Sequence, residues 1–115
     1  MRHVAPQSID PLSEPVFLIL LSLSDAPRHG YALMKEVESL SEGRVRLSTG
    51  TLYGALRRLL EDEWIERFEQ EDTSRDKQAY RLTPVGRRKL RSDLDRMKQL
   101  ARVAATRLNL ASEGI

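Results

Sequence analysis

The chain has 115 residues, no cysteine and a formal net charge of +2, with 40% hydrophobic and 31% charged residues. This length and composition are typical of one globular domain. The absence of cysteine excludes disulfides, thiolate metal sites and cysteine nucleophiles, and the longest apolar run, residues 16–21, is too short to span a bilayer. We therefore expect a cytoplasmic protein with no membrane segment and no cofactor.

Charged residues are sorted along the chain. Residues 43–60 and residues 83–92 each contain four basic residues and no acid, whereas residues 61–72 are rich in acids. Such sorting is typical of basic surface that faces phosphate, but ordinary solvated faces would give the same pattern. Both interpretations stay open on charge alone.

The first half of the chain predicts an arm and two helices. Residues 1–13 contain two prolines and no periodicity, and we interpret them as an N-terminal arm. Apolar residues at helical spacing begin at Glu14-Pro15, where proline suits a first helical turn. A second helix is expected over residues 29–40, and Gly43 follows it because glycine readily takes the left-handed conformation that ends helices.

A third helix is predicted over residues 48–62. Ser48 or Thr49 suits its N-terminal cap, since a hydroxyl accepts from the free N–H groups of the first turn. A buried row is expected from its leucines, which leaves the polar and basic residues on the other faces. The leucines are Leu52, Leu56, Leu59 and Leu60.

The second half of the chain predicts a β-hairpin and one long helix. Residues 64–68 and 79–82 are short strands joined by a wholly polar segment. Thr83-Pro84 then begins a helix with no breaker before Gly114. Apolar residues recur in it at spacings of three and four, which predicts a seam for a partner helix. The seam consists of Leu90, Leu94, Met97, Ala101, Ala104 and Leu108. The alternative is that the seam packs on the chain's own first helix.

The order helix, helix, helix, hairpin, helix predicts a mainly α protein with a small β-hairpin (α+β). We expect a winged helix-turn-helix domain over residues 14–83, with the third helix as recognition helix. A C-terminal dimerisation helix is expected over residues 84–112.

Several segments together resemble the PadR-type transcriptional regulators over roughly residues 14–108. The segments are His29-Gly30-Tyr31, residues 48–53, Ala55-Leu56 with Leu59, Trp64-Ile65 and residues 80–86. The resemblance implies a homodimer joined by the C-terminal helix, which represses nearby genes. In some members a small aromatic or cationic drug bound between the subunits relieves repression, so a small-molecule effector is possible. The short C-terminal helix is similar to that of the smaller members.

The sequence departs from that family at two places. The wing tip of relatives often has a Gly-Arg-Pro motif, whereas residues 72–77 read DTSRDK. Relatives that stack flat drugs use a tryptophan in the last helix, but residues 84–115 contain no aromatic residue. This sequence therefore gives no basis for predicting a drug-stacking site.

Ten residues are candidate contacts to double-stranded DNA: Lys35, Ser48, Thr49, Gly50, Thr51, Tyr53, Arg57, Arg58, Arg75 and Lys77. Tyr53, Thr51, Arg57 and Arg58 each have a structural alternative. Tyr53 would otherwise be a core residue under the wing, Thr51 a helix cap, and the arginines ordinary solvated side chains. His29 is expected to cap or pack rather than bind metal, and Trp64 to anchor the core rather than stack on a ligand.

These residues favour a homodimeric transcriptional repressor that binds a palindromic operator. The alternative is a winged-helix protein-interaction module without DNA binding. An enzyme is not expected, because the sequence shows no paired carboxylates in an apolar setting, no phosphate loop and no Ser/His/Asp arrangement.

Overall fold

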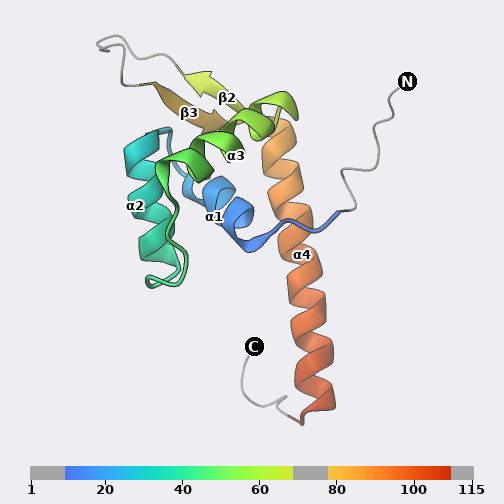
Figure 1. The fold of residues 1–115 in the computed structure, drawn as a ribbon. Helices are drawn as coiled ribbons and strands as arrows, with labels where there is room; N and C mark the ends of the chain where they lie inside the picture. Colours follow the sequence, from blue (N-terminus) through green and yellow to red (C-terminus); the bar gives the residue numbers. More distant parts are fainter. Residues whose placement is uncertain (1–9, 69–77, 110–115) are drawn as a thin grey trace.

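The computed structural model describes residues 10–68 and 78–109. Three short helices pack beneath a small sheet, and the last helix extends away from them (Figure 1). The elements are α1 (Glu14–Ser22), β1 (Arg28–His29), α2 (Gly30–Leu40), α3 (Thr49–Glu61), β2 (Ile65–Phe68), β3 (Ala79–Leu82) and α4 (Pro84–Arg107). This arrangement confirms the predicted mainly helical winged-helix fold. Most of the expected N-terminal arm, together with Arg75 and Lys77, lies outside the described residues.

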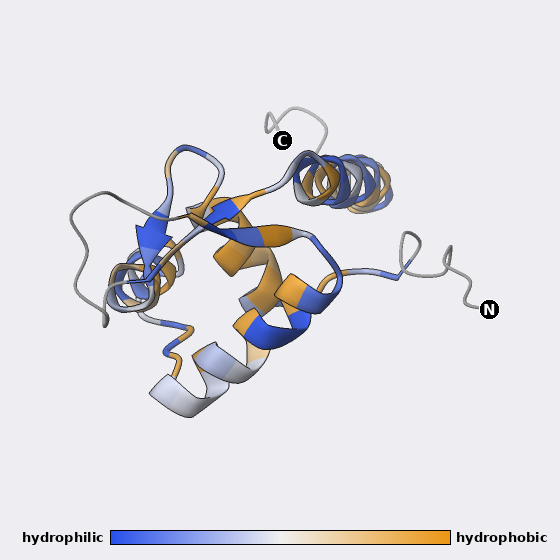
Figure 2. Cartoon of the chain, turned by 90° about the horizontal axis from the view of Figure 1, so that it is seen from above, coloured by the Kyte–Doolittle hydropathy of each residue, from blue (hydrophilic) through white to orange (hydrophobic). Residues whose placement is uncertain are grey.

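The α1 helix forms the centre of the hydrophobic core. Its N-terminus is capped by Ser13, whose Oγ accepts from the backbone N–H of Val16. Ile19 and Leu20 are fully buried, and hydrophobic residues gather on this helix when the molecule is seen from above (Figure 2). Because α1 is apolar on most of its circumference, α2, α3 and α4 can all pack around it.

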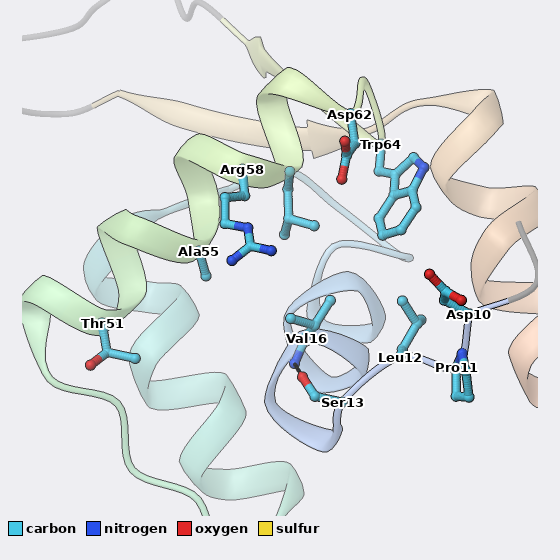
Figure 3. A pocket seen from close by; sticks show the side chains of 11 residues that line it. Asp10, Pro11, Leu12, Ser13, Val16, Thr51, Ala55, Arg58, Asp62 and Trp64 are labelled. Atoms are coloured by element: carbon cyan, nitrogen blue, oxygen red, sulfur yellow. Dashed lines mark hydrogen bonds between the residues drawn. The ribbon is translucent and has the colours of Figure 1, made fainter. Parts of the chain in front are cut away.

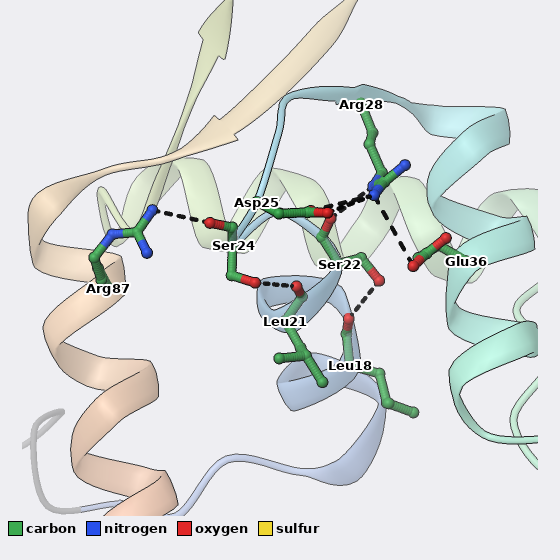
Figure 4. Close-up of polar contacts among 8 residues, drawn as sticks. All are labelled: Leu18, Leu21, Ser22, Ser24, Asp25, Arg28, Glu36 and Arg87. Carbon is green, nitrogen blue, oxygen red and sulfur yellow. Dashed lines mark hydrogen bonds and ion pairs between the residues drawn. The ribbon is translucent and has the colours of Figure 1, made fainter.

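The sheet has three strands in the order β1-β3-β2. The predicted hairpin is confirmed, with Ile65 opposite Leu82 and Arg67 opposite Tyr80. The two-residue strand β1 is not predicted by the sequence, which places His29 at the start of a helix; in the structure Arg28 pairs with Tyr80. The Arg28 side chain holds this segment in place, because its Nε donates to the Ser22 carbonyl at 2.7 Å (Figure 4).

The α4 helix begins in direct contact with the hairpin. Thr83 caps it, because its Oγ1 accepts from the Gly86 N–H at 2.9 Å and donates to the Glu63 carbonyl at 2.7 Å. A Cβ at Gly86 would lie 2.0 Å from the Trp64 carbonyl oxygen, so only glycine permits this close approach. Arg87 adds a hydrogen bond to the Ser24 carbonyl (Figure 4).

The predicted seam of α4 divides into two parts. Leu90 is 8% exposed and belongs to the chain's own core, whereas Leu94 and Leu108 are 44% and 65% exposed. Met97 and Ala101 are half-buried, and Ala104 is exposed. The helix ends at Arg107 rather than at the predicted residue 112, and Asn109 takes a left-handed conformation with φ 61°. Asparagine tolerates that conformation, and this tolerance allows the helix to end before Gly114 is reached.

Two other helices end on left-handed glutamates. The predicted Gly43 is left-handed with φ 83°, but Glu42 before it is also left-handed with φ 55°. After α3, Glu63 has φ 63°, and the N–H of Trp64 bonds the Leu59 carbonyl at 3.0 Å. A non-glycine residue in this conformation is disfavoured by roughly 1–2 kcal/mol. The turn from α3 into the hairpin therefore contains local strain.

We expect Glu63→Gly to stabilise the protein by about 1 kcal/mol, because glycine takes the left-handed conformation without the steric cost but loses more entropy on folding. Denaturant unfolding measures the change. The control is Glu61→Gly, inside the last turn of α3, which should destabilise by up to about 1 kcal/mol. A Glu63→Gly variant no more stable than the wild type would contradict strain at this turn.

Candidate nucleic-acid interface

One face of α3 is fixed in the core and the opposite face is open. Leu52, Leu56 and Leu59 are at most 3% exposed, as the leucine spacing predicts, whereas Leu60, the fourth leucine of the predicted row, is only half-buried. Residues on the opposite and flanking sides are exposed: Gly50, Thr51, Tyr53, Arg57 and Arg58. The helix therefore presents a polar and basic surface while its leucines hold it to α1 and α2.

The N-terminus of α3 is exposed and polar. Ser48 is its cap, because the Ser48 Oγ accepts from the Thr51 N–H at 3.1 Å and donates to the Thr51 Oγ1 at 3.0 Å. The backbone N–H groups of Thr49 and Gly50 have no acceptor within the helix, as in any first turn. These groups and the helix dipole make this end attractive to an anion.

The arginines of α3 keep their charge available. Within the described ranges neither Arg57 nor Arg58 forms an ion pair with a carboxylate. The arginines of the preceding turn differ, since Arg44 pairs with Glu14 and Arg46 pairs with Glu38 at 3.3 Å. The protein's own acids thus neutralise arginines beside α3 but not those on it.

The two arginines of α3 lie on different sides of its outer face. Arg58 projects with Thr51 and Asp62 over a groove between α3 and the start of α1 (Figure 3). Trp64 lines the same groove and is half-buried against the core. Trp64 is therefore both a core residue, as predicted, and partly accessible.

Tyr53 lies between the two interpretations that the sequence left open. Its side chain is 42% exposed, but a Cβ at Gly30 would lie 2.2 Å from its hydroxyl oxygen. The ring thus packs across the first residue of α2. Tyr80 lies close behind it: burial raises the pKa of the Tyr80 phenol, the nearby Tyr53 phenol raises it further, and the Arg67 guanidinium lowers it.

Lys35 and His29 lie on α2 and at its N-terminus. Lys35 is exposed, with its ammonium 5.6 Å from the centre of the Tyr31 ring. His29 occupies the N-cap position but its side chain makes no capping bond, and its Nε2 is buried with no hydrogen-bond partner among the described residues. His29 therefore packs at this position rather than capping the helix through its side chain.

Arg67 joins this surface although it is absent from the predicted contacts. It is exposed on β2 and lies directly opposite Tyr80. The alternation within residues 64–68 gives it a face of the hairpin, but only the register with β3 places that face beside Tyr53.

Neither a metal-ion site nor a membrane-spanning helix is found in the described part of the chain. No group of three or more histidine, aspartate or glutamate side chains is placed to hold a metal ion there. No helix in that part is long and apolar enough to cross a membrane.

Residues 19–92 match the family model of the transcriptional regulator PadR-like family. The chain belongs to this family. PadR-like proteins are transcriptional regulators, which agrees with the expectation that the chain is not an enzyme.

Two curated relatives are each 37% identical to this PadR-like chain over 84 residues, or 73% of its length. One is an uncharacterized 37.1 kDa protein in transposon Tn4556 of Streptomyces fradiae, and the match covers 23% of it. The other is transcriptional regulator Rv3488 of Mycobacterium tuberculosis, of which the match covers 76%. The chain thus spans about a quarter of the first relative and about three quarters of the second.

Solved PadR structures have the same fold. A PadR family regulator from Eggerthella lenta superposes with a TM-score of 0.64 at 30% identity, over 81% of this chain and 80% of that one. Bacillus subtilis PadR, solved in complex with operator DNA, gives a TM-score of 0.63 at 22% identity, over 74% of this chain and 48% of that one.

We expect Gly30→Ala to destabilise this PadR-like fold by about 1–3 kcal/mol, because the added Cβ forces the Tyr53 ring out of its position. In a Tyr53→Ala background the same change should be neutral or stabilising, since alanine favours a helix more than glycine does. Denaturant unfolding of the four proteins measures the coupling. Equal effects of Gly30→Ala in both backgrounds would show that the Tyr53 contact does not matter.

Proposed function

We propose that this PadR-family regulator binds double-stranded DNA through α3 and represses transcription as a homodimer on a palindromic operator. The observation that carries the proposal is the open face of α3, which combines an exposed N-terminus with two arginines unpaired among the described residues. Bacillus subtilis PadR, which shares the fold, was solved with operator DNA, and this supports the proposal.

The contacts follow from the chemistry of the α3 surface. The helix enters the major groove with its N-terminus. Ser48, Thr49 and Thr51 offer hydroxyls to phosphates and base edges, and Thr49 and Gly50 offer free backbone N–H groups. Basic side chains and Tyr53 then contact the flanking backbone and set the register of binding. The basic side chains are Lys35, Arg57 and Arg58, together with Arg75 and Lys77, which lie outside the described residues.

Two glycines on the outward side of α3 support a close approach to a large partner. Gly50 and Gly54 are one helical turn apart, and a Cβ at either position would meet nothing within 4 Å. A glycine inside a helix costs about 1 kcal/mol relative to alanine, and no contact within the described fold requires it here. A duplex pressed against this side of the helix supplies a reason for both glycines.

The homodimer is proposed to form along α4. Beyond Leu90 the helix carries large apolar side chains that are well exposed in the monomer. Leu94 and Leu108 of the seam are 44% and 65% exposed, and Leu100 and Val103, on a second apolar edge, are 55% and 41% exposed. A second copy of the helix would bury the exposed seam residues in a symmetric contact. Two α3 helices related by that symmetry would enter successive major grooves about 34–36 Å apart.

A small-molecule effector completes the proposal. The groove beside Arg58 has a volume of about 490 Å³, within the usual size of ligand sites, and combines Val16 and Trp64 with that arginine. A molecule bound there would compete with DNA for the Arg58 side chain. Trp64 is the only tryptophan in the sequence, so its fluorescence would report binding.

Replacing both Arg57 and Arg58 by glutamate should abolish binding to the DNA upstream of the protein's own gene, because it reverses the charge of the contact face. A gel-shift assay measures binding, and thermal unfolding should show a folded protein. The control, Arg88→Glu with Arg91→Glu, makes the same change in net charge on exposed residues of α4 and should retain most of the affinity.

Normal binding by the α3 variant would show that the contact map is wrong. A folded dimeric wild type that binds no duplex would instead favour the alternative, a winged-helix protein-interaction module.

Leu94→Glu should convert the dimer to a monomer at micromolar concentration, because a carboxylate would be buried without a partner in the seam. Analytical ultracentrifugation measures the mass. The control is Gln99→Glu, which adds one negative charge at an exposed position outside the predicted seam. A wild type that sediments as a monomer would refute the dimer.

A further inference from the structure

We propose that the junction of α3 and β2 is a second phosphate-contacting surface, at which Arg67 binds the DNA backbone beside Tyr53. The inference rests on the proposed DNA binding and adds to it a residue and an element that the α3 contact map does not include. It needs no contribution from residues 69–77 of the wing tip.

The pairing of the hairpin fixes the direction of Arg67. Arg67 and Tyr80 are directly opposite each other on neighbouring antiparallel strands, so their side chains share one face of the sheet. Tyr80 is 5% exposed and lies close to the Tyr53 phenol of α3. Arg67 is therefore on the face of the hairpin that adjoins α3.

A second observation places Arg67 beside α3. Arg67 and Leu60 of α3 line one shallow groove. Leu60 lies one helical turn beyond Arg57 and two turns beyond Tyr53, on the same flank of the helix. Arg67 therefore adjoins the flank of α3 that carries Tyr53 and Arg57.

The Arg67 guanidinium forms no ion pair with a described carboxylate, although glutamate side chains lie near it. Glu63 and Glu66 line the same groove, yet no carboxylate of the described residues lies within ion-pair distance of Arg67. Glu66 pairs instead with Arg81 at 2.7 Å. Arg67 is therefore an exposed cation without an intramolecular anion in the described ranges.

Arg81 is a natural contrast on the same hairpin. It lies opposite Glu66, so it faces away from Tyr80 and α3, and its guanidinium is 4.8 Å from the centre of the Phe68 ring. Both of its interactions are within the chain. Arg81 thus finds its partners within the chain, while Arg67 faces the proposed duplex.

Phosphate is the partner that fits this surface. A guanidinium forms paired hydrogen bonds with phosphate oxygens, and the Tyr53 hydroxyl is a further donor beside it. A backbone contact positions the protein on the duplex and carries no sequence information. The strand ladder holds the Arg67 backbone in place before DNA arrives, which lowers the ordering cost of the contact.

The test compares Arg67→Gln with Arg81→Gln. Affinity is measured over a range of salt concentrations for two probes, the DNA upstream of the protein's own gene and a short duplex of arbitrary sequence. We expect Arg67→Gln to weaken binding to both by a similar factor of about ten and to lower the salt slope by about 0.9. Arg81→Gln should leave the slope unchanged, and Arg67→Lys should recover most of it.

The outcomes separate this inference from the proposed function. A wild type that binds neither probe would refute DNA binding itself. If the wild type binds and the Arg57/Arg58 double variant does not, an unchanged slope in Arg67→Gln would overturn the inference alone. Equal losses in the Arg67 and Arg81 variants would also overturn it, because a general effect of charge or hairpin stability would then explain both. Arg67→Gln should unfold at the wild-type temperature.

Discussion

The organisation of the molecule depends on a single row of three leucines on α3. Leu52, Leu56 and Leu59 attach the helix to α1 and α2, and no other face of α3 is fully buried. A wider apolar face, such as that of α1, would have drawn the helix into the core. The narrow row instead leaves most of the circumference of α3 accessible, with its capped end protruding. One side of this short helix thus stabilises the fold, and the other side is free to contact a partner.

A net charge of only +2 is compatible with this surface because the acids are not distributed evenly. Glu14, Glu38 and Glu66 each pair with an arginine that lies beside the α3 face or turns away from it. These exposed pairs contribute little to stability. Their larger effect is electrostatic, because they occupy these three carboxylates and leave the positive charge on α3 and on the adjoining strand unneutralised. The net charge of the whole chain does not show this separation between paired and unpaired basic residues.

The sequence predicted the elements whose signals are periodic or chemical. The three short helices, the hairpin and the start of α4 at Thr83 follow from spacing and residue type, and the same signals limited the cap of α3 to Ser48 or Thr49. The strand β1 could not be predicted, because two residues show no alternation and its partner is about 50 residues away. The left-handed conformation of Glu42 and Glu63 could not be predicted either, since tertiary contacts impose a conformation that glutamate itself disfavours. The exposed face of α3 could be predicted because the leucine spacing that indicates the helix also indicates which side is buried. The position of Arg67 beside α3 could not be predicted, because it depends on the register between β2 and β3.

The direct attachment of α4 has a mechanical consequence. Gly86 touches the Trp64 carbonyl and Thr83 bonds to Glu63, so no flexible linker separates the long helix from the turn that ends α3. In a dimer joined along α4, each α4 helix would hold the DNA-binding domain of its own chain in a fixed orientation. The crossing angle between the two α4 helices would then set the number of base pairs between the half-sites of the operator. Residues that never touch nucleic acid would in this way select the operators that the protein can span.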